Sequence, residues 1–280
     1  MPVQLSAVTN SQPRRIPGFT SQKYVDLRAL GVYGAPLVVL DDFRVEELPF
    51  SAHPHAGFAA VTYVFEDSPG ALRSRSSLGS DIVVGGGGIV WTQAGSGVIH
   101  EEVPAVRGRE LHGLQLFVNL SAKRKLSPPR VLSLEANNVP EWHNDSQDRV
   151  RVVVGSFQQV ASPLVPDEPF TMLDVALRTQ IAYAVEPARN TVVYVVDGSI
   201  RVRADSRAER VGAGQAIAVS GRGSSVTFEA VSATHLLVMS GIEINEPLVE
   251  EGPFLMNDRS QIEAAIARYR SGAMGGLSPI

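Results

Sequence analysis

Glycine and proline divide this chain into many short apolar runs, and this punctuation limits the folds open to it. The 280 residues include 25 glycines and 18 prolines. Between them lie runs rich in Val, Ile and Leu, such as 35–40, 59–65, 89–93, 111–120 and 190–196. Short runs bounded by turn residues are typical of antiparallel strands. Because helical periodicity is almost absent between them, the pattern favours an all-β barrel or sandwich over alternating strands and helices.

One helix is predicted near the end of the chain, in the segment 258–272. Four residues follow the spacing of one helical face: Ile262, Ala265, Ile266 and Tyr269. Asp258, with Gln261 three residues later, is typical of a capping box, and Gly272 suits the left-handed position after the last turn. We therefore expect a short C-terminal helix packed on a β-domain.

A faint internal repeat indicates two similar domains. VTYVFEDS at 61–68 resembles VVYVVDGS at 192–199, and a glycine-rich turn followed by an apolar run comes after each copy. We expect a first domain over 1–130, a connector over 131–149 and a second domain over 150–280 that ends in the helix.

Two histidines flank a proline in SAHPHAGF, in a chain with only six histidines. Side chains at i and i+2 of a strand point to the same side, so His53 and His55 would face one way. A second pair with this spacing, His100 and Glu102, lies in GSGVIHEEVP. Two such pairs on neighbouring strands, facing into one barrel, would place three imidazoles and a carboxylate around one point.

The prediction of a metal site depends on the second pair, His100 and Glu102, because an HxH pair alone is commonly a chance feature of a surface strand. The chain has no cysteine, so any metal site must use nitrogen and oxygen donors, which suit Fe, Mn, Ni, Co, Cu or Zn. If His100 faces inward, Glu102 does as well and Glu101 faces out, unless a bulge reverses the choice.

Four longer segments resemble the successive signature blocks of the pirin family, within the cupin superfamily. They are HPHAGFAAVTYVFED, WTQAGSGVIHEEVP, LHGLQLFVNLSAKRKLSPPR and GPFLMNDRSQIEAAIARYRSG. The resemblance implies a bicupin, two cupin-type antiparallel β-barrels in one chain, with a short C-terminal helix. It also implies one metal ion in the N-terminal barrel, with these ligands: His53, His55, His100 and Glu102.

The sequence departs from the family pattern around this site. Where pirins usually carry a histidine and an aspartate, the segment 70–80 has serines and an arginine. Ala56 and Ala59 stand where an arginine and a glutamate usually follow the HPH pair. The ligands are intact, so these changes bear on the substrate. Around 192–199 no histidine takes the place of a ligand, so we expect the second barrel to be metal-free and structural.

The other polar residues near these blocks are weaker candidates. His112 precedes an apolar run, His143 lies in the connector and His235 begins a strand of the second half. Gln115 either lines the pocket, where it could hydrogen-bond a substrate or a ligand, or lies on the outer face of its strand.

The resemblance implies a metal-dependent dioxygenase of the quercetin 2,3-dioxygenase type. Its substrates would be a flavonol, a small aromatic enol, and O2, and its metal one divalent ion, Fe(II) first and Mn, Ni, Co, Cu or Zn as alternatives. Glu102 would act as a fourth ligand or as the catalytic base. The alternative is a non-enzymatic metal or redox sensor that binds a transcription factor or a metabolic enzyme. A cupin isomerase is a third reading.

Composition argues against two classes of partner. The formal net charge is −4, which gives no general attraction to nucleic acid or to anionic lipid. No segment approaches the roughly 20 apolar residues of a membrane helix, and the first residues contain no secretory apolar core. We therefore expect a cytoplasmic protein without direct contacts to nucleic acid or membrane.

Overall fold

The computed structural model describes residues 3–16, 19–47, 51–221 and 223–278. The chain forms two compact β-units, each assembled from three segments. The unit that we call the first barrel consists of Pro13–Gln22, Val38–Asn138 and Ile244–Ile280. The unit that we call the second barrel consists of Met1–Gln12, Lys23–Leu37 and Val139–Glu243.

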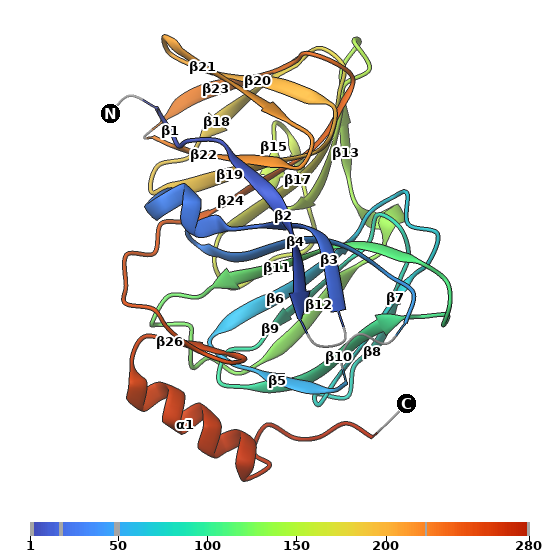
Figure 1. Ribbon diagram of the computed structural model, residues 1–280, viewed down its shortest axis with the longest axis vertical. Helices are drawn as coiled ribbons and strands as arrows, with labels where there is room; N and C mark the ends of the chain where they lie inside the picture. The colour runs from blue at the N-terminus through green and yellow to red at the C-terminus, as the bar shows by residue number, and fades with distance from the viewer. Residues whose placement is uncertain (1–2, 17–18, 48–50, 222, 279–280) are drawn as a thin grey trace. The chain divides into compact units, whose positions relative to one another are not determined.

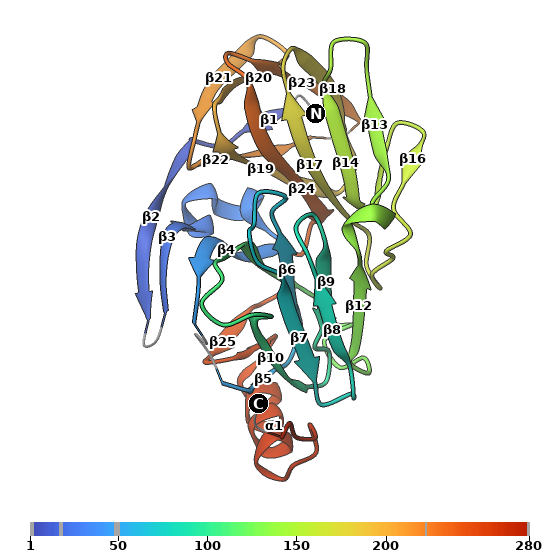
Figure 2. The ribbon, with the colours of Figure 1, turned by 90° about the vertical axis from the view of Figure 1, so that its right-hand side faces the viewer.

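The first barrel is built from antiparallel strands in two groups (Figure 1). One group has the order β12 (Arg130–Leu134), β9 (Ile89–Gln93), β6 (Phe58–Val64), β11 (Leu111–Asn119), β4 (Leu37–Val45), β3 (Phe19–Val25) and β2 (Thr9–Ile16). The other has the order β5 (His53–His55), β10 (Val98–Pro104), β7 (Leu72–Ser76) and β8 (Asp81–Val84). Figure 2 shows β6, β9 and β12 side by side, as their pairing requires. This unit also holds the short helix η2 (Ala136–Asn138).

The second barrel repeats this plan. One group has the order β22 (Gln215–Ser220), β19 (Arg189–Asp197), β24 (Thr234–Ile242), β17 (Phe170–Leu177), β14 (Arg149–Val154) and β13 (Glu141–His143), with β1 (Gln4–Leu5) also beside β22. The other has the order β18 (Gln180–Val185), β23 (Ser224–Ala230), β20 (Ser199–Ala204) and β21 (Arg207–Gly212). A hairpin, β15 (Ser156–Phe157) with β16 (Val160–Ala161), and the helix η1 (Leu27–Gly34) complete it.

The two halves of the sequence repeat are the central strands of the two barrels. Strand β6, which contains the first half of 61–68, lies between β9 and β11. Strand β19, which contains most of 192–199, lies between β22 and β24 in the same way. The predicted all-β fold with two similar domains and a C-terminal helix is confirmed.

The predicted helix is α1 (Arg259–Arg270), and it belongs to the first barrel. The Asp258 carboxylate caps it by accepting a hydrogen bond from the Gln261 backbone N–H at 2.9 Å. Ile262 and Ala265 are buried against Ala56, in a cluster that includes Phe254 and Met256 of the hairpin formed by β25 (Val249–Glu251) and β26 (Phe254–Met256).

The predicted linear division into 1–130, 131–149 and 150–280 therefore differs from the grouping seen in the structure. It assigned the helix to the second domain, whereas the apolar face of α1 completes a core of the first barrel. It also assigned the chain start to the first domain. Gln4 and Leu5 instead pair with Ser220 and Val219 of the second barrel.

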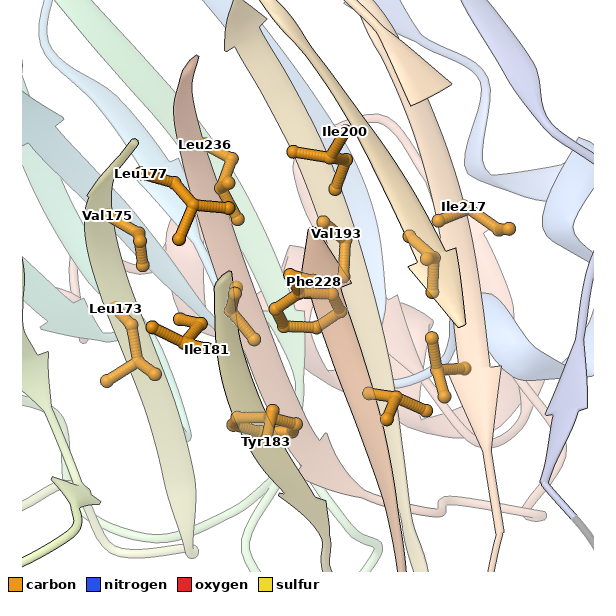
Figure 3. Packing of buried hydrophobic residues seen from close by; sticks show 14 of the residues in the cluster. Leu173, Val175, Leu177, Ile181, Tyr183, Val193, Ile200, Ile217, Phe228 and Leu236 are labelled. Atoms are coloured by element: carbon orange, nitrogen blue, oxygen red, sulfur yellow. The ribbon is translucent and has the colours of Figure 1, made fainter. Parts of the chain in front are cut away.

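The interior of the second barrel is filled by apolar side chains (Figure 3). Leu173, Val193, Phe228 and Leu236 are each fully buried within this cluster. Burial of so much apolar surface in one contiguous core is the main favourable contribution to the stability of such a unit. In the described parts of the chain, no helix is both long enough and apolar enough to cross a bilayer.

Candidate metal centre

Two neighbouring strands of the first barrel bring three histidines together. Strand β10 pairs with β5 so that His100 lies opposite His53, and His55 follows on the same side of β5 as His53. One ring nitrogen from each of the three lies within 4.8 Å of those from the other two. The Nε2 atoms of His53 and His55 are 3.1 Å apart.

Backbone carbonyls fix the tautomers of the two histidines of β5. The Nδ1 atom of His53 lies 2.9 Å from the Ser51 carbonyl oxygen, and that of His55 lies 3.4 Å from the Pro253 carbonyl oxygen. A carbonyl only accepts hydrogen bonds, so each Nδ1 carries the proton and each Nε2 presents a lone pair.

Burial keeps all three imidazoles neutral. It lowers the pKa of His53, and it lowers the pKa of His55 to about 3, with the neighbouring His53 adding to the effect. Burial, followed by the proximity of His55 and His53, holds the pKa of His100 well below its ordinary value. Neutral imidazole is the form that binds a metal.

The three residues fit a divalent metal ion. Two imidazole nitrogens about 2.1 Å from one ion, at an angle between octahedral and tetrahedral, are roughly 3.0–3.4 Å apart. The 3.1 Å between Nε2 of His53 and Nε2 of His55 falls in this range. Within the described residues, the buried Nδ1 of His100 also lacks a hydrogen-bond partner.

Glu102 lies beside this cluster on the same strand as His100. Its Oε1 is 4.0 Å from Nδ1 of His100 and accepts a hydrogen bond from the Ser74 hydroxyl at 3.3 Å. Its Oε2 accepts a short hydrogen bond from the Thr62 hydroxyl. Burial raises the pKa of Glu102 to about 7, although both hydroxyls act to lower it. Glu101 instead forms an ion pair with Arg75 at 3.1 Å.

The local backbone around His55 is held by a glycine and a buried lysine. Gly57 has φ of +88°, and a Cβ there would lie 1.9 Å from the Leu255 carbonyl oxygen, so only glycine allows this approach. The Lys125 ammonium is fully buried and donates to the carbonyl oxygens of Gly57 at 2.9 Å and Leu255 at 3.0 Å. The lysine thus ties the end of β5 to β26.

The three histidines and Glu102 open onto a cavity of about 230 Å³ inside the first barrel. Its apolar walls come from Val39, Phe43, Val45, Leu72, Pro104, Leu111 and Phe117. The volume lies below the usual range of roughly 300–1,000 Å³ for ligand pockets, which favours a small or flat ligand.

Gln115 also lines this cavity, so the pocket-lining alternative is the one that the structure supports. Its Nε2 donates to the Val61 carbonyl oxygen at 3.0 Å, and its Oε1 lies 3.3 Å from the Thr62 hydroxyl oxygen. The single proton of this hydroxyl goes to Glu102 in the shorter hydrogen bond, so Thr62 orients the carboxylate and Gln115 lies beside it.

The other histidines lie outside this cavity. His112 is buried between the carboxylates of Asp42 at 3.0 Å and Asp67 at 2.6 Å. His143 and His235 belong to the second barrel, where they contact Glu141 and Asp174.

Thr62 and Ser74 contact Glu102 and were not predicted from the sequence, and the same is true of Arg14 and Asp41, which line the cavity. A signal for Ser74 exists in LRSRS, because alternation places Ser74 and Ser76 on the face of β7 opposite its arginines, and both serines are buried. Thr62 lies inside the fully buried run of β6, where it has no such signal.

Comparison with known proteins relates most of the chain to one family. The model of the Pirin family matches residues 10–118, and that of the Pirin C-terminal cupin domain matches residues 172–275. A Pseudomonas aeruginosa protein provisionally named a quercetin 2,3-dioxygenase is 32% identical over 251 residues, which cover 85% of this chain and 86% of that protein.

Solved structures share the fold. A crystal structure of quercetin 2,3-dioxygenase from Acinetobacter baumannii has a TM-score of 0.85 at 24% identity, covering 99% of this chain and 100% of that one. The bacterial pirin YhhW from Escherichia coli, solved in complex with nickel(II), has a TM-score of 0.66 at 17% identity, covering 85% of this chain and 99% of that one. Matched by both family models and by a relative of this identity along most of its length, the chain belongs to the pirin family.

Proposed function

We propose that the protein is a metal-dependent dioxygenase that acts on a flavonol such as quercetin. The observation that carries the proposal is the convergence of three neutral imidazoles, within 4.8 Å of one another, on the wall of an apolar cavity. The name of the Pseudomonas aeruginosa relative supports the same reaction class.

His53, His55 and His100 would hold the metal ion. When bound, a first-row divalent ion such as Fe(II) supplies Lewis acidity toward a substrate oxygen and redox chemistry toward O2. The carbonyls of Ser51 and Pro253 keep the ring nitrogens of His53 and His55 directed at the ion.

Glu102 would complete the site, either as a fourth ligand or as the base that takes the proton of the flavonol hydroxyl at Oε1. A carboxyl with a pKa of about 7 is matched to proton transfer near neutral pH. The hydroxyls of Thr62 and Ser74 donate to the carboxylate and so stabilise its ionised form.

The cavity walls would orient the substrate and limit the access of water. Phe117 lies close to the histidine cluster, with its ring centroid 5.4 Å from that of His55. Phe43 lines the same cavity. Aromatic and aliphatic walls favour a flat aromatic ligand and protect a reactive intermediate from hydrolysis.

Oxygen uptake with quercetin tests the proposal directly. The protein would be reconstituted without oxygen with Fe(II), Mn(II), Ni(II) or Cu(II), beside a His55→Ala variant. His143→Ala is the matched control, because it removes an exposed histidine of the second barrel. We expect turnover that follows the metal, is lost in His55→Ala and is retained in His143→Ala.

Metal-loaded protein that neither consumes oxygen nor cleaves any flavonol would contradict the dioxygenase. One bound metal per chain without turnover would shift the interpretation to the regulator that binds a protein partner, with the same ligands in a sensing role.

A further inference from the structure

The wall of the cavity contains a second polar group, separate from the histidines. Strand β4 alternates, so that Val39, Asp41, Phe43 and Val45 share one face, and all four line the cavity. Arg14 of β2 lines it too. The histidines and Glu102 come from β5 and β10, in the other group of strands.

Asp41 is a buried carboxyl with an unused oxygen. Its side chain is 5% exposed, and among the described residues its Oδ1 has no hydrogen-bond partner. Burial raises the pKa of Asp41, while a hydrogen bond with Ser21 and the charge of Arg14 act to lower it. A buried acceptor left without a donor costs about 1–3 kcal/mol, so such a group calls for an explanation.

Arg14 places a donor beside this acceptor. Its Nη1 is 4.0 Å from Oδ2 of Asp41, which is too long for a direct hydrogen bond, and its side chain is 38% exposed. The pair therefore offers a carboxylate acceptor and guanidinium donors at one place in a cavity whose other walls are largely apolar.

Building on the proposed dioxygenase, we infer that Asp41 and Arg14 form a recognition site for neighbouring hydroxyl groups on an aromatic ring of the substrate. One hydroxyl donates to Oδ1 of Asp41, and its neighbour accepts from the Arg14 guanidinium. A ring with two adjacent hydroxyls satisfies both groups, whereas a ring with none leaves Oδ1 of Asp41 without a donor. The substrate class is thus a flavonol with a dihydroxylated pendant ring.

Three flavonols that differ only in the hydroxyls of this ring test the inference: quercetin with two, kaempferol with one and galangin with none. Their affinities for metal-loaded protein would be measured by calorimetry under nitrogen, so that binding is read without turnover. We expect Asp41→Asn to weaken quercetin binding about tenfold or more and to change galangin binding less than twofold, because quercetin loses a charge-assisted hydrogen bond that galangin never makes.

Two further variants keep the result interpretable. Asp81→Asn removes an acid that is paired with Arg73 at 2.7 Å and does not line the cavity, so it should leave all three affinities unchanged. Arg14→Gln should weaken quercetin more than galangin, with an unchanged metal content. This variant tests the other member of the Asp41–Arg14 pair, whose side chain is less buried than that of Asp41.

The outcomes separate this inference from the proposed function. An equal loss for all three flavonols in Asp41→Asn, or no loss for any, would overturn the recognition site even if quercetin is turned over. Selective loss of quercetin binding in a protein without oxygen uptake would support the site and overturn the dioxygenase.

Discussion

Two neighbouring acids on β10 lie in opposite environments, because successive residues of a strand face opposite sides. Glu101 forms an ion pair with Arg75, whose side chain is 14% exposed. Glu102 instead faces the cavity with His100 and accepts hydrogen bonds from Thr62 and Ser74. The ion pair holds the first acid in place, whereas the second remains within reach of a substrate.

Replacement of Glu102 by glutamine keeps the shape of the side chain and removes its charge. If Glu102 is the base, we expect turnover per bound metal to fall by about 10²–10⁴-fold, the usual contribution of a positioned base. Oxygen uptake normalised to metal content measures this effect. Glu101→Gln is the matched control and should change turnover less than twofold. Equal losses in both variants would contradict a specific role for Glu102.

At the scale of the elements, the metal centre depends on a segment far along the chain. Strand β26 and helix α1 pack against Ala56, next to His55, and the Leu255 N–H donates to the Ala56 carbonyl oxygen at 3.0 Å. The close approach requires the absence of a side chain at Gly57. The segment thus fixes the end of β5 and, through the Pro253 carbonyl, the ring of His55.

Gly57→Ala should separate these elements. The new Cβ would lie 1.9 Å from a backbone oxygen of Leu255, so the backbone must move, and we expect a loss of about 3–5 kcal/mol in the free energy of unfolding. Metal affinity should fall about tenfold or more, because the support of His55 is disturbed. Urea unfolding and metal titration measure the two effects.

Gly79→Ala is the control for backbone strain. Its φ of +86° is close to that of Gly57, but a Cβ there meets no atom within 4 Å. We expect a loss of only about 1–2 kcal/mol from the left-handed conformation and unchanged metal affinity. If both variants behave alike, strain rather than the contact with Leu255 explains the Gly57 result.

The elements around the histidines could be predicted because local periodicity determines them. The spacing of His53, His55 and His100 predicted one face of two strands, and the pairing of β5 with β10 brings that face together. The position of α1 was not predictable. Its apolar stripe, which includes Ile262, specifies a buried face but not the partner, and that partner, Ala56, lies about 200 residues away in the chain.

At the scale of the whole molecule, one strand plan is used twice with different interiors. The first barrel lines its cavity with histidines and acids, whereas the second fills its interior with residues such as Phe228 and Leu236. The sequence repeat predicted the shared plan, because both copies keep the same apolar strands. The position of Asp41 in the cavity wall was not predicted, because the surroundings of an acid in an apolar strand are known only once the facing strands are known.

Leu236→Ala should therefore reduce stability without altering the metal centre. Leu236 is fully buried in the core of the second barrel, so its truncation should cost about 2–5 kcal/mol. The candidate ligands all come from the first barrel, so metal affinity at 25 °C should stay within twofold of the wild type. Thermal unfolding and metal titration give the two readouts, and a large loss of affinity would show that the site depends on the second core.

The interleaving of the two barrels along the chain has a consequence for biosynthesis. The ribosome completes the strands that carry the histidines by residue 138, but the last segment of the first barrel begins at residue 244. At about 5–20 residues per second, roughly 5–20 s of translation separate the two. Throughout this interval the nascent chain carries His55 without Pro253 and Lys125 without the Leu255 carbonyl, so the metal-binding geometry is completed only late in translation, after the strands of the second barrel have been made.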